Sequence, residues 1–258
     1  MDNIDFIISY LKQKGLTVKS SKIPKVVFVG GIPGAGKDLL VEKTKLNFKN
    51  DDFNVIDVDL YRRYIDHANT IEETVDLCNR IETELFEFFI ENKKNIIIVG
   101  TLRSFDYLDN IITNKIIPNG YKIYFNIIVT NRIESALSTF ERYISDKLIK
   151  DLFPRLNKLE FLDITYKEFY QAMDYYSKKE YFKNNRLFIR GENMGLPKEL
   201  KYSNNICDAI CDEEKRQISI IDSNNIKNRI ENVYSKLTTK EEKQEFDLVC
   251  EKILNISR

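Results

Sequence analysis

Residues 25–41, KVVFVGGIPGAGKDLLV, decide the fold, because a buried strand, a glycine-rich turn and the start of a helix follow one another here. From Gly31 to Gly36-Lys37 the spacing is G-x-x-x-x-G-K. In this context backbone N–H groups of the turn and of the helix N-terminus bind phosphate oxygens, and the lysine adds a positive charge at the β- and γ-phosphates. The stretch predicts a nucleotide-binding loop, with a purely structural turn as the alternative. The residues expected to contact ATP are Gly31, Pro33, Gly34, Ala35, Gly36, Lys37, Asp38 and Leu39.

Further apolar runs of strand length follow the loop, separated by segments long enough for helices. The predicted strands are 25–30, 54–59, 95–100, 122–130 and 186–190, and the predicted helices are 37–48, 70–91, 132–146 and 159–182. Alternation of this kind predicts an α/β fold, a P-loop NTPase-like doubly wound parallel sheet of about five strands flanked by helices. Ligands of such sheets bind at the carboxyl ends of the strands.

The pattern changes after residue 200, where no strand-like run occurs. Asp222 begins a polar cluster that can cap one helix, and Thr238 with Glu241 has the spacing of a capping box for another. We therefore expect a P-loop kinase domain over 1–200 and a helical C-terminal extension over 201–258, packed on the same domain.

Charge and composition exclude several classes of function. The 258 residues contain 40 Lys+Arg and 40 Asp+Glu, so no bulk positive field is available for nucleic-acid binding. Cys207 and Cys211 stand four residues apart without further ligands nearby, which favours reduced thiols over a zinc site. The chain has no basic leader and no run of about 18 apolar residues, so we expect a cytoplasmic protein that does not contact a membrane.

Asp38 stands where this type of loop normally has a serine or threonine whose hydroxyl ligates Mg²⁺. A carboxylate can also ligate Mg²⁺, and an acid in the first turn of a helix interacts favourably with the helix dipole. It also brings negative charge close to the β-phosphate. We favour Asp38 as a metal ligand with altered affinity; the alternative is a weakened nucleotide site.

Two acids, Asp57 and Asp59, end the predicted strand 54–59. Alternation along a strand would place both on one face, near the crevice where ligands bind. Asp59 is then in position to accept the proton of an attacking hydroxyl, and Asp57 to contact the substrate. The alternatives are solvated acids at a strand end or a helix cap.

The ordered set of motifs resembles the zeta toxin family of P-loop kinases, the toxins of toxin–antitoxin pairs. The similar elements are G-x-P-G-A-G-K at 31–37, I-D-x-D-x-aromatic-basic at 56–62, Gly100-Thr101-x-Arg103, and Glu141-Arg142-Tyr143 with Arg155 thirteen residues beyond Arg142. The similarity covers nearly the whole chain. It implies ATP-dependent phosphorylation of a UDP-linked N-acetyl amino sugar, typically the 3′-hydroxyl of UDP-N-acetylglucosamine. It also implies a small helical antitoxin that covers the ATP site.

By the same resemblance, Asp59 is the general base and Lys37 holds the β- and γ-phosphates. Arg142 and Arg155 would neutralise charge on the transferred group, and Thr101 and Arg103 would line the side of the sugar nucleotide. Surface salt bridging is the alternative for the arginines.

Two departures from the family pattern leave the reading open. Val99 stands where the family's strand carries a glutamate, and the acid expected on the following helix aligns near Thr83, between Glu82 and Glu84. Both glutamates are therefore candidate substrate residues. The alternative functions are a kinase of the same fold with another small hydroxyl substrate, and a nucleotide-binding regulator with weakened catalysis.

Overall fold

The computed structural model describes residues 3–65, 71–149, 154–191, 195–203, 205–220 and 223–256. Asp222, the expected cap of a C-terminal helix, lies outside the described residues.

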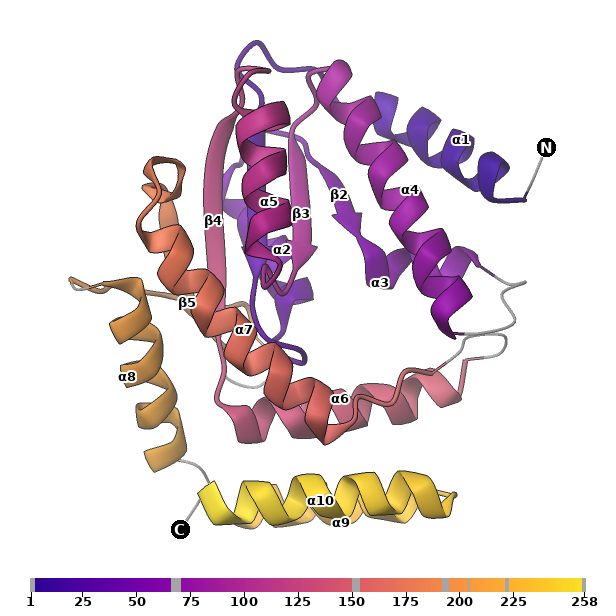
Figure 1. The fold of residues 1–258 in the computed structure, drawn as a ribbon, viewed down its shortest axis with the longest axis vertical. Coiled ribbons are helices and arrows are strands. Elements are labelled where there is room, and N and C mark those ends of the chain that lie inside the picture. Colours follow the sequence, from indigo (N-terminus) through magenta and orange to yellow (C-terminus); the bar gives the residue numbers. More distant parts are fainter. Residues whose placement is uncertain are drawn as a thin grey trace.

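A single mostly parallel sheet forms the centre of the molecule (Figure 1). Among the described residues it has six strands in the order β2-β3-β1-β4-β5-β6. The strands are β1 (Lys25–Gly30), β2 (Asn54–Asp57), β3 (Ile96–Gly100), β4 (Lys122–Val129), β5 (Asn185–Ile189) and β6 (Lys198–Leu200). Neighbours from β2 to β5 run parallel, and β6 pairs antiparallel with β5. The predicted doubly wound parallel sheet is confirmed.

Helices flank this sheet and continue beyond it. They are α1 (Asn3–Leu16), α2 (Lys37–Asn47), α3 (Val58–Tyr61), α4 (Ile71–Glu91), α5 (Phe105–Ile111), α6 (Arg132–Lys147), α7 (Leu159–Ser177), α8 (Ile206–Ser219), α9 (Ser223–Lys236) and α10 (Lys240–Ile256). Two short 3₁₀ turns, η1 (Arg62–Tyr64) and η3 (Glu180–Phe182), and a π-helical turn, η2 (Ile112–Ile116), complete the described elements. Figure 1 shows α2 behind the sheet and α5 in front of it.

The core lies on both faces of the central strands. Residues 26–29 of β1 have no exposed surface, as expected for a parallel strand covered on both sides. On one face the rings of Phe28 and Phe125, from adjacent strands, stack with their centroids 4.9 Å apart. Continuous apolar runs therefore predicted these strands well, because burial on both faces removes any need for polar alternation.

Three elements differ from the sequence predictions. The edge strand β6 was not predicted because its three residues, KEL, are mostly exposed and carry no apolar run. Helix α1, which packs against α4, was also not predicted, although its buried Ile4, Ile7 and Ile8 have helical spacing. Strand β2 ends at Asp57, and Asp59 lies in α3, so the two acids do not share one strand face as predicted.

The last three helices are packed on the rest of the chain. Helix α8 contacts α7 and β4, whereas α9 and α10 lie side by side and both contact α6 (Figure 1). Phe246 of α10 is fully buried, and its ring centroid lies 4.8 Å from that of Phe140 on α6.

The capping box of α10 is shifted by one residue from its predicted position. Thr239, not Thr238, accepts the N–H of Glu242 at 3.2 Å, and the Glu242 carboxylate accepts the N–H of Thr239 at 3.0 Å. Glu242 also accepts the N–H of Thr238 at 2.7 Å. The sequence has a glutamate at both 241 and 242, so spacing alone could not choose between the two frames.

Candidate active site

The glycine-rich loop between β1 and α2 is shaped by two residues in the left-handed region. Gly34 has φ 70° and Gly36 has φ 91°, conformations that residues with a side chain rarely adopt. A Cβ atom on Gly34 would also lie 2.6 Å from the carbonyl oxygen of Ser135 on α6. The outer side of the loop therefore packs directly on α6, which turns the inner side toward the helix N-terminus of α2.

The other predicted loop residues support the same shape. Ala35 is fully buried and its N–H is donated to the carbonyl of Ile32 at 3.2 Å. The carbonyl of Pro33 accepts a hydrogen bond from Ser135 Oγ at 2.5 Å. Leu39 is half-buried in the first turn of α2. Gly31 has no room for a side chain, since a Cβ there would lie 2.8 Å from the carbonyl oxygen of Ile128.

Lys37 is folded back on its own loop. Its Nζ donates to the carbonyl oxygens of Gly31 and Ile32, both at 3.1 Å. Burial lowers the pKa of this amine to about 8, against the opposing effect of the Asp59 carboxylate. A bound phosphate would favour the charged form of this amine and could replace the two carbonyl partners.

The two acids after β2 have separate structural positions. Asp57 is the N-cap of α3 and accepts the N–H of Asp59 at 3.0 Å, so the cap that was an alternative in the sequence is formed. Burial raises the pKa of Asp57. Asp59 is 47% exposed, and its Oδ2 lies 3.0 Å from the guanidinium of Arg142. Although burial opposes ionisation of Asp59, the charges of Arg142 and Lys37 outweigh it and lower the pKa of this carboxyl.

The two predicted arginines lie around Asp59 from different segments. Arg142 comes from α6, the helix on which the glycine-rich loop packs, whereas Arg155 precedes α7. The positive charge of Arg155 acts on Asp59, and burial lowers the pKa of Arg155. Its guanidinium lies 4.7 Å from the ring centroid of Phe161. The structure thus brings Lys37, Asp59, Arg142 and Arg155 into one electrostatically connected group.

The two candidate glutamates of α4 point in different directions. Glu84 forms an ion pair at 2.7 Å with Lys12 of α1, on the side of α4 that faces away from the loop. Glu82 lies close enough to Asp57 for the two carboxylates to influence each other, and burial raises the pKa of Glu82. Glu84 is therefore paired with a residue of α1, whereas Glu82 lies near Asp57 and stays a candidate substrate residue. Neighbouring residues of a helix point about 100° apart, so an alignment that is uncertain by one residue cannot tell which glutamate of α4 faces the site.

Arg103 and Thr101 follow the end of β3. Between them Leu102 adopts φ 57°, which is uncommon for a residue with a side chain, and its carbonyl accepts the hydroxyl of Tyr176 at 3.0 Å. Arg103 forms an ion pair with Glu168 at 2.7 Å and lies 5.3 Å from the ring of Phe161. Phe161 therefore packs against the guanidinium groups of both Arg103 and Arg155, a role that sequence reasoning missed.

Asp38 is exposed in the first turn of α2, and its charge acts on Lys37. An exposed carboxylate beside the loop suits Mg²⁺, which prefers oxygen ligands and retains several waters. The described ranges contain no group of three or more His, Cys, Asp or Glu side chains able to hold a metal ion. Asp38 alone could therefore supply only one protein ligand to a Mg²⁺ at this loop.

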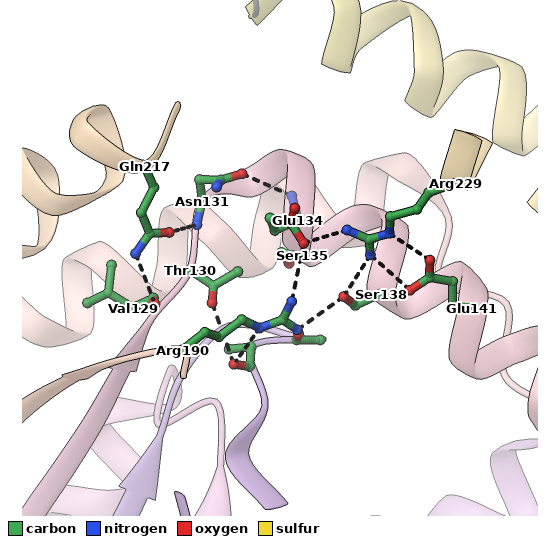
Figure 2. A network of polar contacts seen from close by, with 12 residues as sticks. Val129, Thr130, Asn131, Glu134, Ser135, Ser138, Glu141, Arg190, Gln217 and Arg229 are labelled. Carbon is green, nitrogen blue, oxygen red and sulfur yellow. Dashed lines mark hydrogen bonds and ion pairs between the residues drawn. The ribbon is translucent and has the colours of Figure 1, made fainter. Parts of the chain in front are cut away.

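Sequence reasoning also missed Arg190, which follows the last residue of β5 and donates to two carbonyls of the glycine-rich loop (Figure 2). A basic residue at the carboxyl end of a strand next to β4 was a usable signal, because ligands gather at that edge of a parallel sheet.

A glycine-rich loop between β1 and α2, at the carboxyl edge of a parallel sheet, defines a P-loop protein of the kinase-like class. The family model for the zeta toxin matches residues 9–201. The chain belongs to the zeta toxin family, whose members are kinase-like, and the resemblance inferred from its motifs is confirmed.

A chain from a structural study of the PezAT chromosomal toxin–antitoxin system of the human pathogen Streptococcus pneumoniae has a similar fold, with a TM-score of 0.69. Its sequence identity is 19%, and the match covers 91% of this chain and 97% of that chain. No curated protein matches this sequence. Within the described residues, no helix is both long and apolar enough to cross a membrane.

Proposed function

We propose that this protein is an ATP-dependent kinase that phosphorylates a hydroxyl group of a UDP-N-acetyl amino sugar, the 3′-hydroxyl of UDP-N-acetylglucosamine. The observation that carries the proposal is the 3.0 Å contact between Asp59 and Arg142, within electrostatic range of Lys37. A carboxylate, an arginine and the loop lysine in one crevice are what transfer of a γ-phosphoryl group to an alcohol requires.

In the proposed reaction each group has one task. Lys37 and the backbone N–H groups of the loop hold the phosphates of ATP. Asp59 orients the acceptor hydroxyl and takes its proton as the oxygen bonds to the γ-phosphorus. The bond from that phosphorus to the β–γ bridging oxygen breaks, and ADP leaves. Arg142 and Arg155 neutralise the charge on the transferred group.

The low pKa of Asp59 suits this task. A carboxylate that is ionised across the neutral range is always ready to orient a hydroxyl, and in phosphoryl transfer positioning contributes more than strong basicity. The exposure of Asp59 and Arg142, 47% and 43%, leaves both side chains accessible to an incoming acceptor.

Mg²⁺, when bound with ATP, would supply positive charge that offsets the negative charge of the phosphates. Asp38 is the residue of this chain that would hold it, in place of the usual hydroxyl. On the acceptor side we assign Asp57, Glu82, Thr101 and Arg103 to the sugar nucleotide. Arg103 suits a diphosphate, because a guanidinium matches phosphate geometry.

We further propose that the protein acts in the cytoplasm as the toxin of a toxin–antitoxin pair. The structural likeness to a chain from such a system and the membership of the zeta toxin family support this role. A small helical antitoxin that covers the ATP site would restrain the enzyme.

Two observations keep a second candidate function in view, a nucleotide-binding regulator with weakened catalysis. Asp38 replaces the hydroxyl residue of the loop, and Val99, paired in register with Asp57, replaces the family's glutamate. A third candidate function is a kinase of the same fold that phosphorylates another small hydroxyl compound. It would differ from the proposed kinase only in the residues that bind the acceptor.

Incubation of the purified protein with ATP and a panel of nucleotide sugars, nucleosides and free amino sugars, analysed by mass spectrometry, tests the proposal. We expect a gain of one phosphate on UDP-N-acetyl amino sugars only, and none with Lys37→Ala. Phosphorylation of a different hydroxyl compound would retain the kinase and replace the substrate. ATP binding without any product across the panel would favour the regulator.

A further inference from the structure

Arg190 holds the outer side of the glycine-rich loop (Figure 2). Its Nε donates to the carbonyl of Ala35 at 3.2 Å, and one terminal nitrogen donates to the carbonyl of Gly34. The same nitrogen donates to Ser138 Oγ on α6 at 3.1 Å. By holding these two carbonyls, Arg190 constrains the orientation of the peptide units of the glycine-rich loop.

The charge of Arg190 is balanced by a carboxylate that it shares with a second arginine. Glu134 of α6 lies 3.3 Å from Arg190 and 2.6 Å from Arg229. Arg229 also forms a two-pronged contact with Glu141, its Nε and a terminal nitrogen donating at 2.7 and 2.9 Å. Figure 2 shows the two guanidinium groups on either side of Glu134 and Ser138. The four charges cancel within one partly buried cluster.

Arg229 belongs to α9, which lies beyond residue 201, the last residue of the family match. A second residue from this part of the chain, Gln217 of α8, also reaches the nucleotide edge of the sheet. Its Oε1 accepts the N–H of Asn131 at 2.8 Å, just after the end of β4. The C-terminal helices therefore contact the rim of the site at two independent points.

We propose that the C-terminal helices are part of the nucleotide-binding site, with Arg229 as a positioning residue that acts through Arg190 on the glycine-rich loop. This inference rests on the proposed binding of ATP at that loop. Arg229 neutralises Glu134 and Glu141, which leaves the guanidinium of Arg190 available to the loop carbonyls. Without Arg229, Glu141 loses its partner and Glu134 keeps only Arg190, so the two carboxylates attract Arg190 away from Gly34 and Ala35.

Three measurements on the full chain test the role of Arg229: the ATP affinity, the KM of the acceptor, and hydrogen exchange without nucleotide. By calorimetry, Arg229→Met is expected to bind ATP about tenfold more weakly, the effect of losing one to two charge-assisted contacts. The KM of the hydroxyl acceptor stays unchanged. By hydrogen exchange without nucleotide, the amides of residues 31–37 are expected to exchange several-fold faster.

A double-mutant cycle separates positioning from general stability. Arg190→Met is expected to weaken ATP binding at least as much as Arg229→Met, and adding Arg229→Met to it should cost little more, because the second residue acts through the first. Additive losses of ATP affinity would overturn the proposal. Equal ATP affinity and equal loop exchange in Arg229→Met and wild type would also overturn it.

The controls are matched in position and charge. Lys227→Met changes an exposed residue of α9, the helix that carries Arg229. Arg186→Met removes an exposed ion pair with Glu199 from β5, the strand that Arg190 follows. Both should leave ATP affinity and loop exchange unchanged. If Arg229→Met does not fold, Arg229→Lys can replace it. Lysine retains the positive charge but lacks the two-pronged guanidinium contact, so it should give a smaller loss of ATP affinity. Failure of wild type to bind ATP would refute the proposed function, whereas the exchange measurement would still decide on Arg229.

Discussion

Lys37 illustrates how single residues of the site are held ready in the free protein. Its amine is satisfied by two carbonyls of its own loop, and its pKa is lowered to about 8. Asp59 and Arg142 are likewise paired with each other. In the proposed reaction each of these groups would exchange a partner within the protein for a partner on the nucleotide or acceptor, so no charge is left unpaired before binding.

The pKa of Lys37 predicts a pH dependence of ATP binding. Below about pH 8 the amine is charged in the free protein; above it the amine is neutral and must take up a proton when phosphate binds. We expect ATP affinity to be flat from pH 6.5 to 7.5 and to fall toward tenfold per pH unit well above about pH 8. Calorimetry in two buffers of different ionisation enthalpy should show proton uptake near pH 8.

Lys37→Arg provides the control for this prediction, because a guanidinium remains charged throughout the range. Its ATP affinity, although lower, should not change between pH 7 and 9. An equally steep loss in Lys37→Arg would assign the pH dependence to another group.

At the scale of elements, α6 links three parts of the molecule. One side carries Ser135 and Ser138 against the glycine-rich loop, and Arg142 extends from the same helix to Asp59. Helices α9 and α10 also contact α6. Displacement of α6 would therefore disturb the nucleotide loop and the arginine together.

Glu242 attaches α10 to α6 and allows this packing to be tested. Its carboxylate, 4% exposed, accepts from Tyr143 and from Lys147, both at 2.6 Å, and from the backbone at the helix start. Burial alone would raise the pKa of Glu242, but these contacts outweigh burial and lower it to about 2. We expect Glu242→Gln to lower the free energy of unfolding by about 2 kcal/mol at pH 7.

The loss should depend on pH in a defined direction. The contribution of Glu242 is fully present above its unfolded pKa of about 4.5 and disappears as the pH falls toward about 2. The difference between wild type and Glu242→Gln in urea unfolding should therefore be equal at pH 7 and pH 5.5 and shrink steadily as the pH falls from about 4.5 toward about 2. A difference that persists unchanged at low pH would mean that packing, not charge, accounts for the loss. Glu241→Gln, at an exposed position on the same helix, should have little effect.

For the whole molecule, the strands that could be predicted from sequence are those buried on both faces of the sheet. Strands β1 and β4 lie at the centre with both faces covered, so their apolar runs carry the signal, whereas the exposed edge strand β6 has none. The short helix α3 begins within the run predicted as one strand. The placement of Asp59 therefore depended on a cap at Asp57 that alternation could not reveal.

The candidate site was predictable where a motif fixes residues within one segment, and less so where distant segments meet. The loop from Gly31 to Lys37 was predicted from its spacing together with the strand before it and the helix after it. The sequence could not distinguish Glu82 from Glu84, because that required the direction of each side chain on α4. In the structure, Glu84 forms an ion pair with Lys12 of α1. Arg229 lies 194 residues after Ala35, so no local sequence pattern connects them. Only tertiary packing links Arg229 to the loop, through Glu134 and Arg190.

Single-turnover transfer of the γ-phosphoryl group from ATP to UDP-N-acetylglucosamine, in wild type and in Asp59→Asn, tests the central claim most directly. With ATP binding measured in parallel, we predict that Asp59→Asn binds ATP normally and transfers about 10²- to 10⁴-fold more slowly, because it cannot accept the proton of the acceptor hydroxyl. Transfer by Asp59→Asn at the wild-type rate would contradict the account.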